Sequence, residues 1–247
     1  MEPADHFSGV AKAYAAFRPH YPRELFDYVA SIAPRHHRAW DCGAGSGQAT
    51  TDLAERFDEV IGTDLSAEQI AKASARPNIR YLVAPAESVP IESGTVDLTT
   101  VAQALHWFDH APFYDEVRRV SVPGAVIAAW TYASPRMEGD VGAALHRLMY
   151  ETVGPYWPPE RQYVEQEYRT IPFPFTRLES PRLVLEESWS LEQVAGYARS
   201  WSATARYVAA RGSDPVVTFE ARLRESWRGS TTRAITWPLV LIAGRVD

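Results

Sequence analysis

The sequence predicts an α/β protein built on a doubly wound, mostly parallel sheet of seven strands, with an inserted cap. Three observations lead to this prediction. Strand and helix patterns alternate through the first half of the chain, a glycine-rich loop follows the first of these strands, and the alternation stops at residue 134. Strands that are separated by helices at this spacing favour a parallel sheet with helices on both of its faces.

The expected elements follow from hydrophobic spacing and from signals at their ends. Ser66 with Gln69 three residues later is the pattern of a capped helix start, and Val122-Pro123-Gly124 is a stop signal. The expected strands lie at 38–42, 60–64, 79–83, 96–101, 125–132, 182–189 and 234–243. The expected helices lie at 48–57, 66–74, 112–120, 138–152, 191–201 and 214–228.

Residues 134–180 break the alternation and are rich in proline and aromatic residues. Proline at this density disfavours central strands, and a segment of this length buries little apolar surface alone. We therefore expect one domain with an inserted substrate cap. Its expected parts are an N-terminal helical lid at 1–35, a ligand-binding core at 36–133, the cap at 134–180, and the end of the sheet with C-terminal helices at 181–247.

The composition is that of a globular protein, with 46% hydrophobic and 23% charged residues among 247. A formal charge of −6 does not favour binding to nucleic acid or to an anionic membrane surface. The single cysteine, Cys42, excludes a disulfide framework and is expected to fill the core. Because the sequence shows no secretory signal and no long apolar run, we expect a cytoplasmic protein that is a monomer or a weak homodimer.

The segment Asp41-Cys42-Gly43-Ala44-Gly45-Ser46-Gly47 lies between the first strand and the helix that follows it. Glycines at such a turn let the backbone pass close to a ligand. A dinucleotide-binding loop would have glycine where this chain has Gln48. The pattern suits a nucleoside that carries a small zwitterionic tail, and a plain tight turn is the alternative.

Polar residues also follow the next three strands. Asp64 ends the second strand, where an acid can accept hydrogen bonds from both hydroxyls of a ribose; a turn or a helix cap is its alternative role. Ala86 and Glu87 follow the third strand, and residues 103–108 follow the fourth. Because ligands of open α/β sheets bind at the carboxyl ends of the strands, these segments predict one site.

On these residues the chain resembles the class I S-adenosylmethionine-dependent methyltransferases, which have a Rossmann-like fold, over residues 36–132. It is most similar to the small-molecule group that includes trans-aconitate methyltransferase. The resemblance implies S-adenosylmethionine as cofactor, S-adenosylhomocysteine as product and a small-molecule acceptor. The closer resemblance rests on Phe17-Arg18-Pro19, Tyr21-Pro22, Pro85-Ala86-Glu87, Ala104-Leu105-His106-Trp107-Phe108, Gly154-Pro155-Tyr156-Trp157 and Trp201-Ser202-Ala203.

The resemblance also implies which residues bind the cofactor. The glycines would line its methionine moiety, Asp64 would hold its ribose, and Ala86 with Glu87 would border its adenine. Gln103 would lie near the methionine end, and Asp41 would orient the loop or meet the amino group. The full implied set is Asp41, Gly43, Ala44, Gly45, Gly47, Asp64, Leu65, Ala86, Glu87 and Gln103.

The acceptor side contains one candidate base, His106, with Trp107 beside it as a wall of the methyl site. A carboxylate acceptor needs no base, whereas a hydroxyl or an amine needs one. His106 would therefore act as a base or orient the acceptor, and a structural hydrogen bond is the alternative. Tyr14, Arg18 and Tyr21 have helical spacing, and we expect them on one face of a lid, where Arg18 would pair with a carboxylate.

The predicted function is methyl transfer from S-adenosylmethionine to a small-molecule acceptor, above all a carboxylate or another oxygen of a small organic acid. A hydroxyl, nitrogen or carbon acceptor is an alternative, as is a noncatalytic S-adenosylmethionine-binding protein. A nicotinamide oxidoreductase is opposed by Gln48. The histidines and acids show no metal-ligand spacing, so no metal is expected.

Overall fold

The computed structural model describes residues 18–247, so Tyr14 and Phe17 lie outside the described part of the chain. The chain divides into two compact units. The larger unit comprises residues 21–133, 162–183 and 239–247, and the smaller unit includes 134–161 and 184–238. These boundaries differ from the expected cap at 134–180. Residues 162–183 belong to the larger unit because Tyr168, Ile171 and Phe175 are buried in its core.

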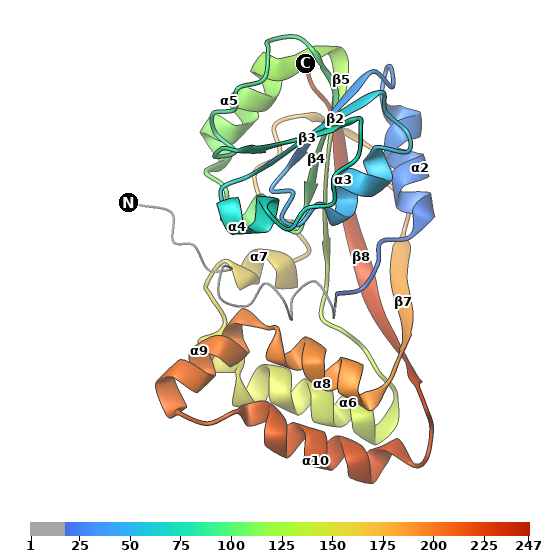
Figure 1. Cartoon of the computed structure of the whole chain (residues 1–247), viewed down its shortest axis with the longest axis vertical. Coiled ribbons are helices and arrows are strands. Elements are labelled where there is room, and N and C mark those ends of the chain that lie inside the picture. Colours follow the sequence, from blue (N-terminus) through green and yellow to red (C-terminus); the bar gives the residue numbers. More distant parts are fainter. Residues whose placement is uncertain (1–17) are drawn as a thin grey trace. The chain divides into compact units, whose positions relative to one another are not determined.

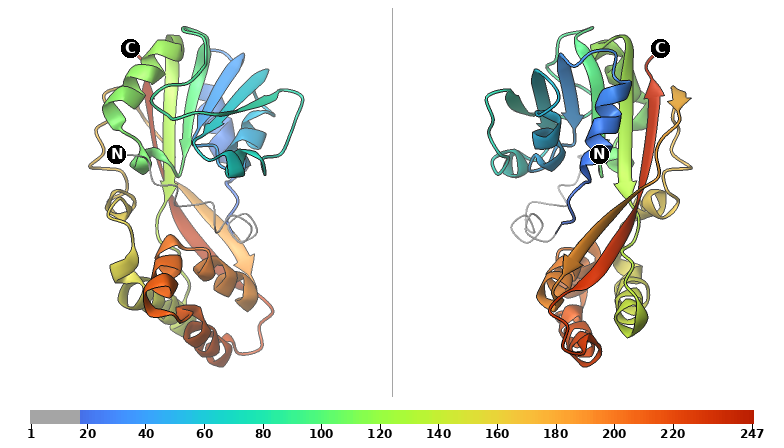
Figure 2. Two further views of the ribbon diagram at one scale, coloured as in Figure 1. Left: turned by 60° about the vertical axis from the view of Figure 1, so that its left-hand side comes forward. Right: turned by 90° about the vertical axis from the view of Figure 1, so that its right-hand side faces the viewer.

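The sheet confirms the expected mostly parallel α/β architecture. Its strand order is β3-β2-β1-β4-β5-β8-β6, and β7 also pairs with β8. The first five strands are parallel to their neighbours, and β8 runs antiparallel beside β5 (Figure 2). The strands are β1 (Arg38–Cys42), β2 (Glu59–Asp64), β3 (Ile79–Val83), β4 (Val96–Ala102), β5 (Ser121–Tyr132), β6 (Thr176–Leu178), β7 (Leu183–Trp189) and β8 (Arg233–Arg245).

Within residues 18–247 the sheet has eight strands, one more than the sequence pattern predicts. The additional strand is β6, which pairs antiparallel with β8 through Thr176, Arg177 and Leu178. It lies within the segment 134–180, whose prolines disfavour central strands. Its three residues are too few for a hydrophobic period, so only the available edge of β8 shows that they form a strand.

The helices of the larger unit lie on both faces of the sheet. Figure 1 shows α5 on one face and α2 with α3 on the other. The helices α3 and α4 are shorter than expected because the chain continues from each as a turn, with Arg56 N–H donating to Leu53 and Lys72 N–H to Gln69. The helices are α2 (Arg23–Ile32), α3 (Gln48–Leu53), α4 (Ala67–Ile70), the 3₁₀ turn η2 (Leu105–Trp107), α5 (His110–Val120) and α7 (Arg161–Glu165).

The described residues before and within α2 differ from the expected helical lid at 1–35. Arg18 and Tyr21 precede α2 and are not helical, so the expected helical face does not run through them. Each stands directly before a proline, and a residue in that position is disfavoured in the α region. Helix α2 itself is packed into the core, where Leu25 and Phe26 are fully buried.

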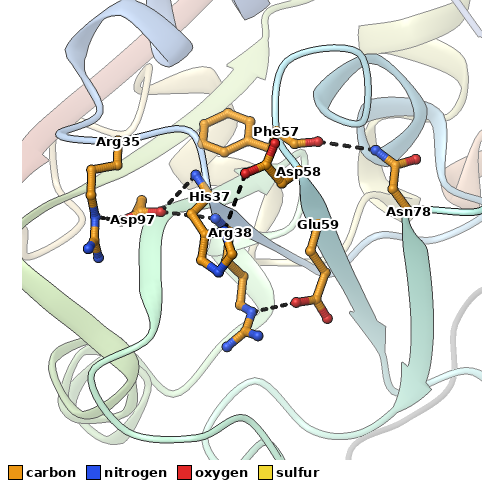
Figure 3. A network of polar contacts seen from close by, with 8 residues as sticks. All are labelled: Arg35, His37, Arg38, Phe57, Asp58, Glu59, Asn78 and Asp97. Atoms are coloured by element: carbon orange, nitrogen blue, oxygen red, sulfur yellow. Dashed lines mark hydrogen bonds and ion pairs between the residues drawn. The ribbon is translucent and has the colours of Figure 1, made fainter.

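The opposite end of the sheet from the glycine loop is held by a polar network around the buried Asp97 of β4 (Figure 3). Its Oδ2 accepts hydrogen bonds from the backbone N–H groups of His37 and Arg38, at 3.1 and 2.9 Å. Its Oδ1 accepts one from Nε of Arg35 at 3.0 Å. This network anchors the start of β1 on β4 and so sets where β1 begins.

The smaller unit is mainly helical. Its core contains an aromatic cluster in which Trp189, Tyr197 and Trp237 meet edge to face, with ring centres 4.9–5.7 Å apart. Helix α9 is not predicted by the sequence pattern, since only Ala203 and Thr204 of it are buried and no apolar stripe marks it. The helices are α6 (Gly139–His146), η3 (Arg147–Thr152), η4 (Gly154–Tyr156), α8 (Leu191–Arg199), α9 (Ser202–Arg211) and α10 (Pro215–Trp227).

None of the helices in residues 18–247 combines the length and the apolar character needed to cross a membrane.

Candidate active site

The glycine loop between β1 and α3 has a backbone that only glycine tolerates. Gly43, Gly45 and Gly47 all have positive φ angles, of 73°, 56° and 83°. A Cβ atom on Gly43 would lie 2.5 Å from Cβ of Ala104, and one on Gly47 would overlap the Tyr81 hydroxyl. A Cβ atom on Gly45 would meet no atom of residues 18–247 within 4 Å. The loop is thus packed against the sheet at both ends and open at its middle.

Asp64, at the end of β2, is joined directly to this loop. Its Oδ2 accepts a hydrogen bond from the backbone N–H of Gly45, and its Oδ1 accepts one from Ser66, both at 2.8 Å. Ser66 in turn caps α4, since its hydroxyl accepts from the Gln69 backbone N–H at 3.3 Å, as the sequence predicts. Asp64 therefore links the end of β2 to the glycine loop and to the start of α4.

Apolar side chains are exposed beside Asp64. Leu65 follows it directly and is 49% exposed, and Val83, at the end of the neighbouring strand β3, is 54% exposed. Ala86 is buried after β3, whereas Oε1 of Glu87 accepts a hydrogen bond from the Asp109 backbone at 3.0 Å. Exposed apolar surface next to a polar anchor is what a flat aromatic base requires.

Asp41, the last residue but one of β1, is fully buried beneath the loop. Its carboxylate accepts hydrogen bonds from the hydroxyls of Thr50 at 2.5 Å and Thr100 at 3.0 Å. Burial raises the pKa of Asp41 to about 6, against the opposing effect of these two hydrogen bonds. Asp41 therefore connects β1 with α3 and β4, and its own side chain is not exposed to a ligand.

Gln103 lies just past the end of β4 in a strained position. Its φ angle is +58°, which is rare for a residue with a side chain and is common at functional sites. Its Oε1 accepts a hydrogen bond from the Thr131 hydroxyl at 2.7 Å. Its Nε2 is buried and has no hydrogen-bond partner among residues 18–247. A buried amide donor of this kind is stabilised when a ligand supplies an acceptor.

His106 and Trp107 lie in the turn η2 after β4, with their ring centres 4.8 Å apart. The Nδ1 atom of His106 is 2.9 Å from the hydroxyl of Tyr168, which is fully buried. Sequence reasoning missed Tyr168 because it lies 62 residues away, in a segment without a recognisable motif.

Arg18, Tyr21 and Cys42 contact other parts of the chain. Arg18 lies over the ring of Tyr197 in the smaller unit, at 5.5 Å from the ring centre. Tyr21 packs in the larger unit, with its ring edge against Phe26 and Trp130 at 6.2 and 5.8 Å. Cys42 is buried, and burial raises the pKa of its thiol, which confirms its role as a core residue.

Comparison with known proteins finds relatives of this chain. Residues 40–129 match the model of the methyltransferase domain family. A protein of Dictyostelium discoideum that is named as a methyltransferase is 36% identical over 228 residues, 91% of this chain and 87% of that one. An uncharacterized methyltransferase of Mycobacterium tuberculosis is 35% identical over 175 residues, 70% of this chain and 67% of the relative.

A solved structure extends the likeness to the fold. It is described as a type II methyltransferase from Anaeromyxobacter dehalogenans, is 43% identical, and covers 93% of this chain and 98% of its own, with a TM-score of 0.87. The chain belongs to the class I S-adenosylmethionine-dependent methyltransferases.

The residues present fit S-adenosylmethionine. Within the described residues the loop is open at Gly45, the buried Nε2 of Gln103 has no hydrogen-bond partner, and Asp64 lies beside exposed apolar side chains. Among the described residues, no group of three histidine, cysteine or acidic side chains is placed to hold a metal ion.

Proposed function

We propose that this methyltransferase acts on an oxygen atom of a small-molecule acceptor, within the range of small organic acids that the trans-aconitate methyltransferase group suggests. The observation that carries the proposal is the placement of His106 and Gln103 after the same strand, β4, where ligands of such sheets bind. The formal charge of −6 supports a small acceptor over a nucleic acid.

The cofactor residues follow from the site geometry. Gly43, Ala44, Gly45 and Gly47 would line the methionine moiety, and Gln103 would donate its Nε2 hydrogens to it. These assignments are supported by the open middle of the loop and by the buried amide that lacks an acceptor. Asp41 would act indirectly, because its two threonine partners hold the loop in place.

Asp64 and the residues around it would bind the nucleoside. Asp64 would accept hydrogen bonds from the ribose hydroxyls, while Leu65 and Val83 offer exposed apolar surface for the adenine. Ala86 and Glu87 would border the base. When bound, S-adenosylmethionine supplies a methyl group on a positively charged sulfur, which is a neutral leaving group after transfer.

The acceptor would be held by residues of the β4 end. Trp107 presents an aromatic ring beside His106, and His106 either orients the acceptor or removes its proton. Alignment of the acceptor oxygen with the methyl group is the main requirement of the step. Arg18, Tyr21 and Tyr14 are further candidates for binding an acceptor carboxylate. Their substitution with alanine tests this role.

The proposal is tested by a transfer screen with methyl-tritiated S-adenosylmethionine. Small di- and tricarboxylic acids, phenols, amines and RNA are offered in parallel, after calorimetry has shown that the protein binds the cofactor. We expect turnover with an oxygen acceptor and a large loss in His106→Ala. The matched control is His110→Gln, whose imidazole contacts only the Leu105 carbonyl among the hydrogen bonds described. Methylation of the amines or of RNA, with none of the oxygen acceptors, would overturn the proposal.

A further inference from the structure

Gln103 is held at two points by consecutive residues of the neighbouring strand β5. Its backbone N–H donates a hydrogen bond to the carbonyl oxygen of Trp130 at 2.9 Å. Its side-chain Oε1 accepts one from the hydroxyl of Thr131 at 2.7 Å. Thr131 is fully buried, so this contact is made away from water, where a hydrogen bond is stronger. Strand β5 therefore sets the position of both the backbone and the amide of Gln103.

The other end of the same amide is a donor without an acceptor. Nε2 of Gln103 is buried and has no hydrogen-bond partner among residues 18–247. Because Oε1 is bound to Thr131, the planar amide directs its Nε2 hydrogens away from β5. The residue as a whole is partly exposed, so this amide lies within reach of a ligand after a small local shift. A strained backbone, with φ at +58°, and an unsatisfied donor are expected together where a ligand completes the contacts.

The order of the strands indicates which part of S-adenosylmethionine lies at this amide. Asp64 ends β2, the glycine loop follows β1 and Gln103 follows β4, and these strands are neighbours in the order β2-β1-β4. Adjacent strands are about 4.8 Å apart, so a ligand that binds at Asp64 and crosses the loop reaches β4 after about 10 Å. With the ribose at Asp64, the amino acid end of the cofactor lies at β4. The hydrogen-bond acceptor of that end is the carboxylate, since the ammonium group is a donor.

We propose that Thr131 is a positioning residue for cofactor binding, whose hydroxyl orients the Gln103 amide so that Nε2 donates to the carboxylate of the methionine moiety. The inference rests on the proposed placement of S-adenosylmethionine and deepens it. It names the chemical group that Gln103 recognises and the residue that orients Gln103. An amide that is fixed before binding loses less conformational entropy when the ligand arrives, which favours tighter binding.

The first test replaces the donor by an acceptor of the same size. Gln103→Glu keeps an oxygen for Thr131 but turns the donor into a carboxylate oxygen, which repels the carboxylate of S-adenosylhomocysteine. The Kd of this ligand should rise by about 10- to 100-fold, the effect of losing a hydrogen bond to a charged group. Decarboxylated S-adenosylhomocysteine keeps the amine and lacks the carboxylate, so its Kd should not rise. An equal rise for both ligands in calorimetry would overturn the proposal.

The second test removes the hydroxyl that orients the amide. Thr131→Val should raise the Kd for S-adenosylhomocysteine by about two- to tenfold, the range for a neutral hydrogen bond, and Thr131→Ser should restore it. The matched control is Thr99→Val on β4, because Thr99 is also fully buried and its hydroxyl has no hydrogen-bond partner among the described residues. Its Kd should equal that of the wild type. If Thr131→Val does not fold, Thr131→Cys takes its place, since a thiol is only a weak donor.

A double-mutant cycle separates orientation of the amide from a general effect on the fold. Gln103→Leu leaves no amide to orient, so the addition of Thr131→Val to this variant should not change the Kd for S-adenosylhomocysteine further. A structural effect of Thr131 would instead raise the Kd by the same factor in both backgrounds. That result, or an unchanged Kd in the folded Thr131→Val protein, would overturn the positioning role.

These binding measurements contain no methyl acceptor, so they are independent of the proposed oxygen methylation. A protein that shows the expected Kd values but methylates only amines or RNA would refute the proposed function and leave the roles of Thr131 and Gln103 standing. Conversely, turnover with an oxygen acceptor, together with equal losses of both ligands in Gln103→Glu, would support the proposed function and refute this inference.

Discussion

Replacing Asp41 by asparagine should change the pH dependence of stability, because Asp41 is a buried carboxylate without a cationic partner among its described contacts. Its pKa is raised from 3.8 to about 6, chiefly by burial and also by the charge of Asp64, while hydrogen bonds from Thr50 and Thr100 lower it. The folded protein therefore binds this proton more tightly than the unfolded chain does. The resulting stability is fully present below pH 4 and is lost as the pH rises to about 6.

The magnitude follows from the size of the shift. Each pKa unit corresponds to about 1.4 kcal/mol, so a shift of about two units costs the wild type about 3 kcal/mol at pH 7. Asp41→Asn has no such charge to bury. Its free energy of unfolding relative to the wild type should rise by about 3 kcal/mol between pH 3 and pH 7. Because this is a difference between two pH values, any pH-independent cost of the substitution cancels.

The measurement is urea unfolding of both proteins at several pH values between 3 and 8. Asp115→Asn serves as the control, since its carboxylate is 80% exposed and its removal should leave the wild-type profile unchanged. The reasoning is refuted if the profiles of Asp41→Asn and the wild type run parallel from pH 3 to pH 7. That result would mean that the two threonine hydroxyls compensate fully for the burial of the charge.

Three further substitutions test the site and its support. Asp64→Ala should raise the Kd for S-adenosylmethionine by about 10²–10⁴-fold, since two charge-assisted hydrogen bonds worth roughly 1.5–3 kcal/mol each are lost; calorimetry showing an unchanged Kd would remove Asp64 from the site. Gly43→Ala should lower the Tm, because φ is +73° and the new methyl would lie 2.5 Å from Cβ of Ala104; an equal Tm would mean that the loop relaxes. Asp97→Ala should destabilise the protein by about 3 kcal/mol in urea, as two backbone N–H groups lose their acceptor, whereas Arg35→Ala should cost less than about 1 kcal/mol because its side chain is 60% exposed. Similar losses in both variants would show that the ion pair matters more than the backbone contacts.

The sequence pattern located the strands and the glycine loop well because both depend on neighbouring residues. Alternating strand and helix signals predict β1 to β5, and the glycines between β1 and α3 all adopt the positive φ angles that only glycine accommodates easily. One departure from the pattern, before α2, also has a local cause. Pro19 and Pro22 keep Arg18 and Tyr21 out of the helical conformation that their spacing suggests.

The boundaries of the two units were not predictable from composition. The proline-rich segment 134–180 reads as one insertion, yet its second part packs Tyr168 and Phe175 into the core of the larger unit and places β6 on the sheet. Which core a short apolar segment enters depends on where space remains in the folded molecule. The hydrophobic pattern of the sequence does not predict where that space lies.

The enzyme class was predictable from the sequence alone, and so was the meeting of the glycine loop with Asp64. Both segments follow consecutive strands of a parallel sheet, whose carboxyl ends meet at one edge. Only the tertiary structure decided what surrounds His106. Its partner Tyr168 is 62 residues away, and Thr131 is 28 residues from Gln103. Contacts between such distant segments form only when the core packs, so no pattern along the chain predicts them.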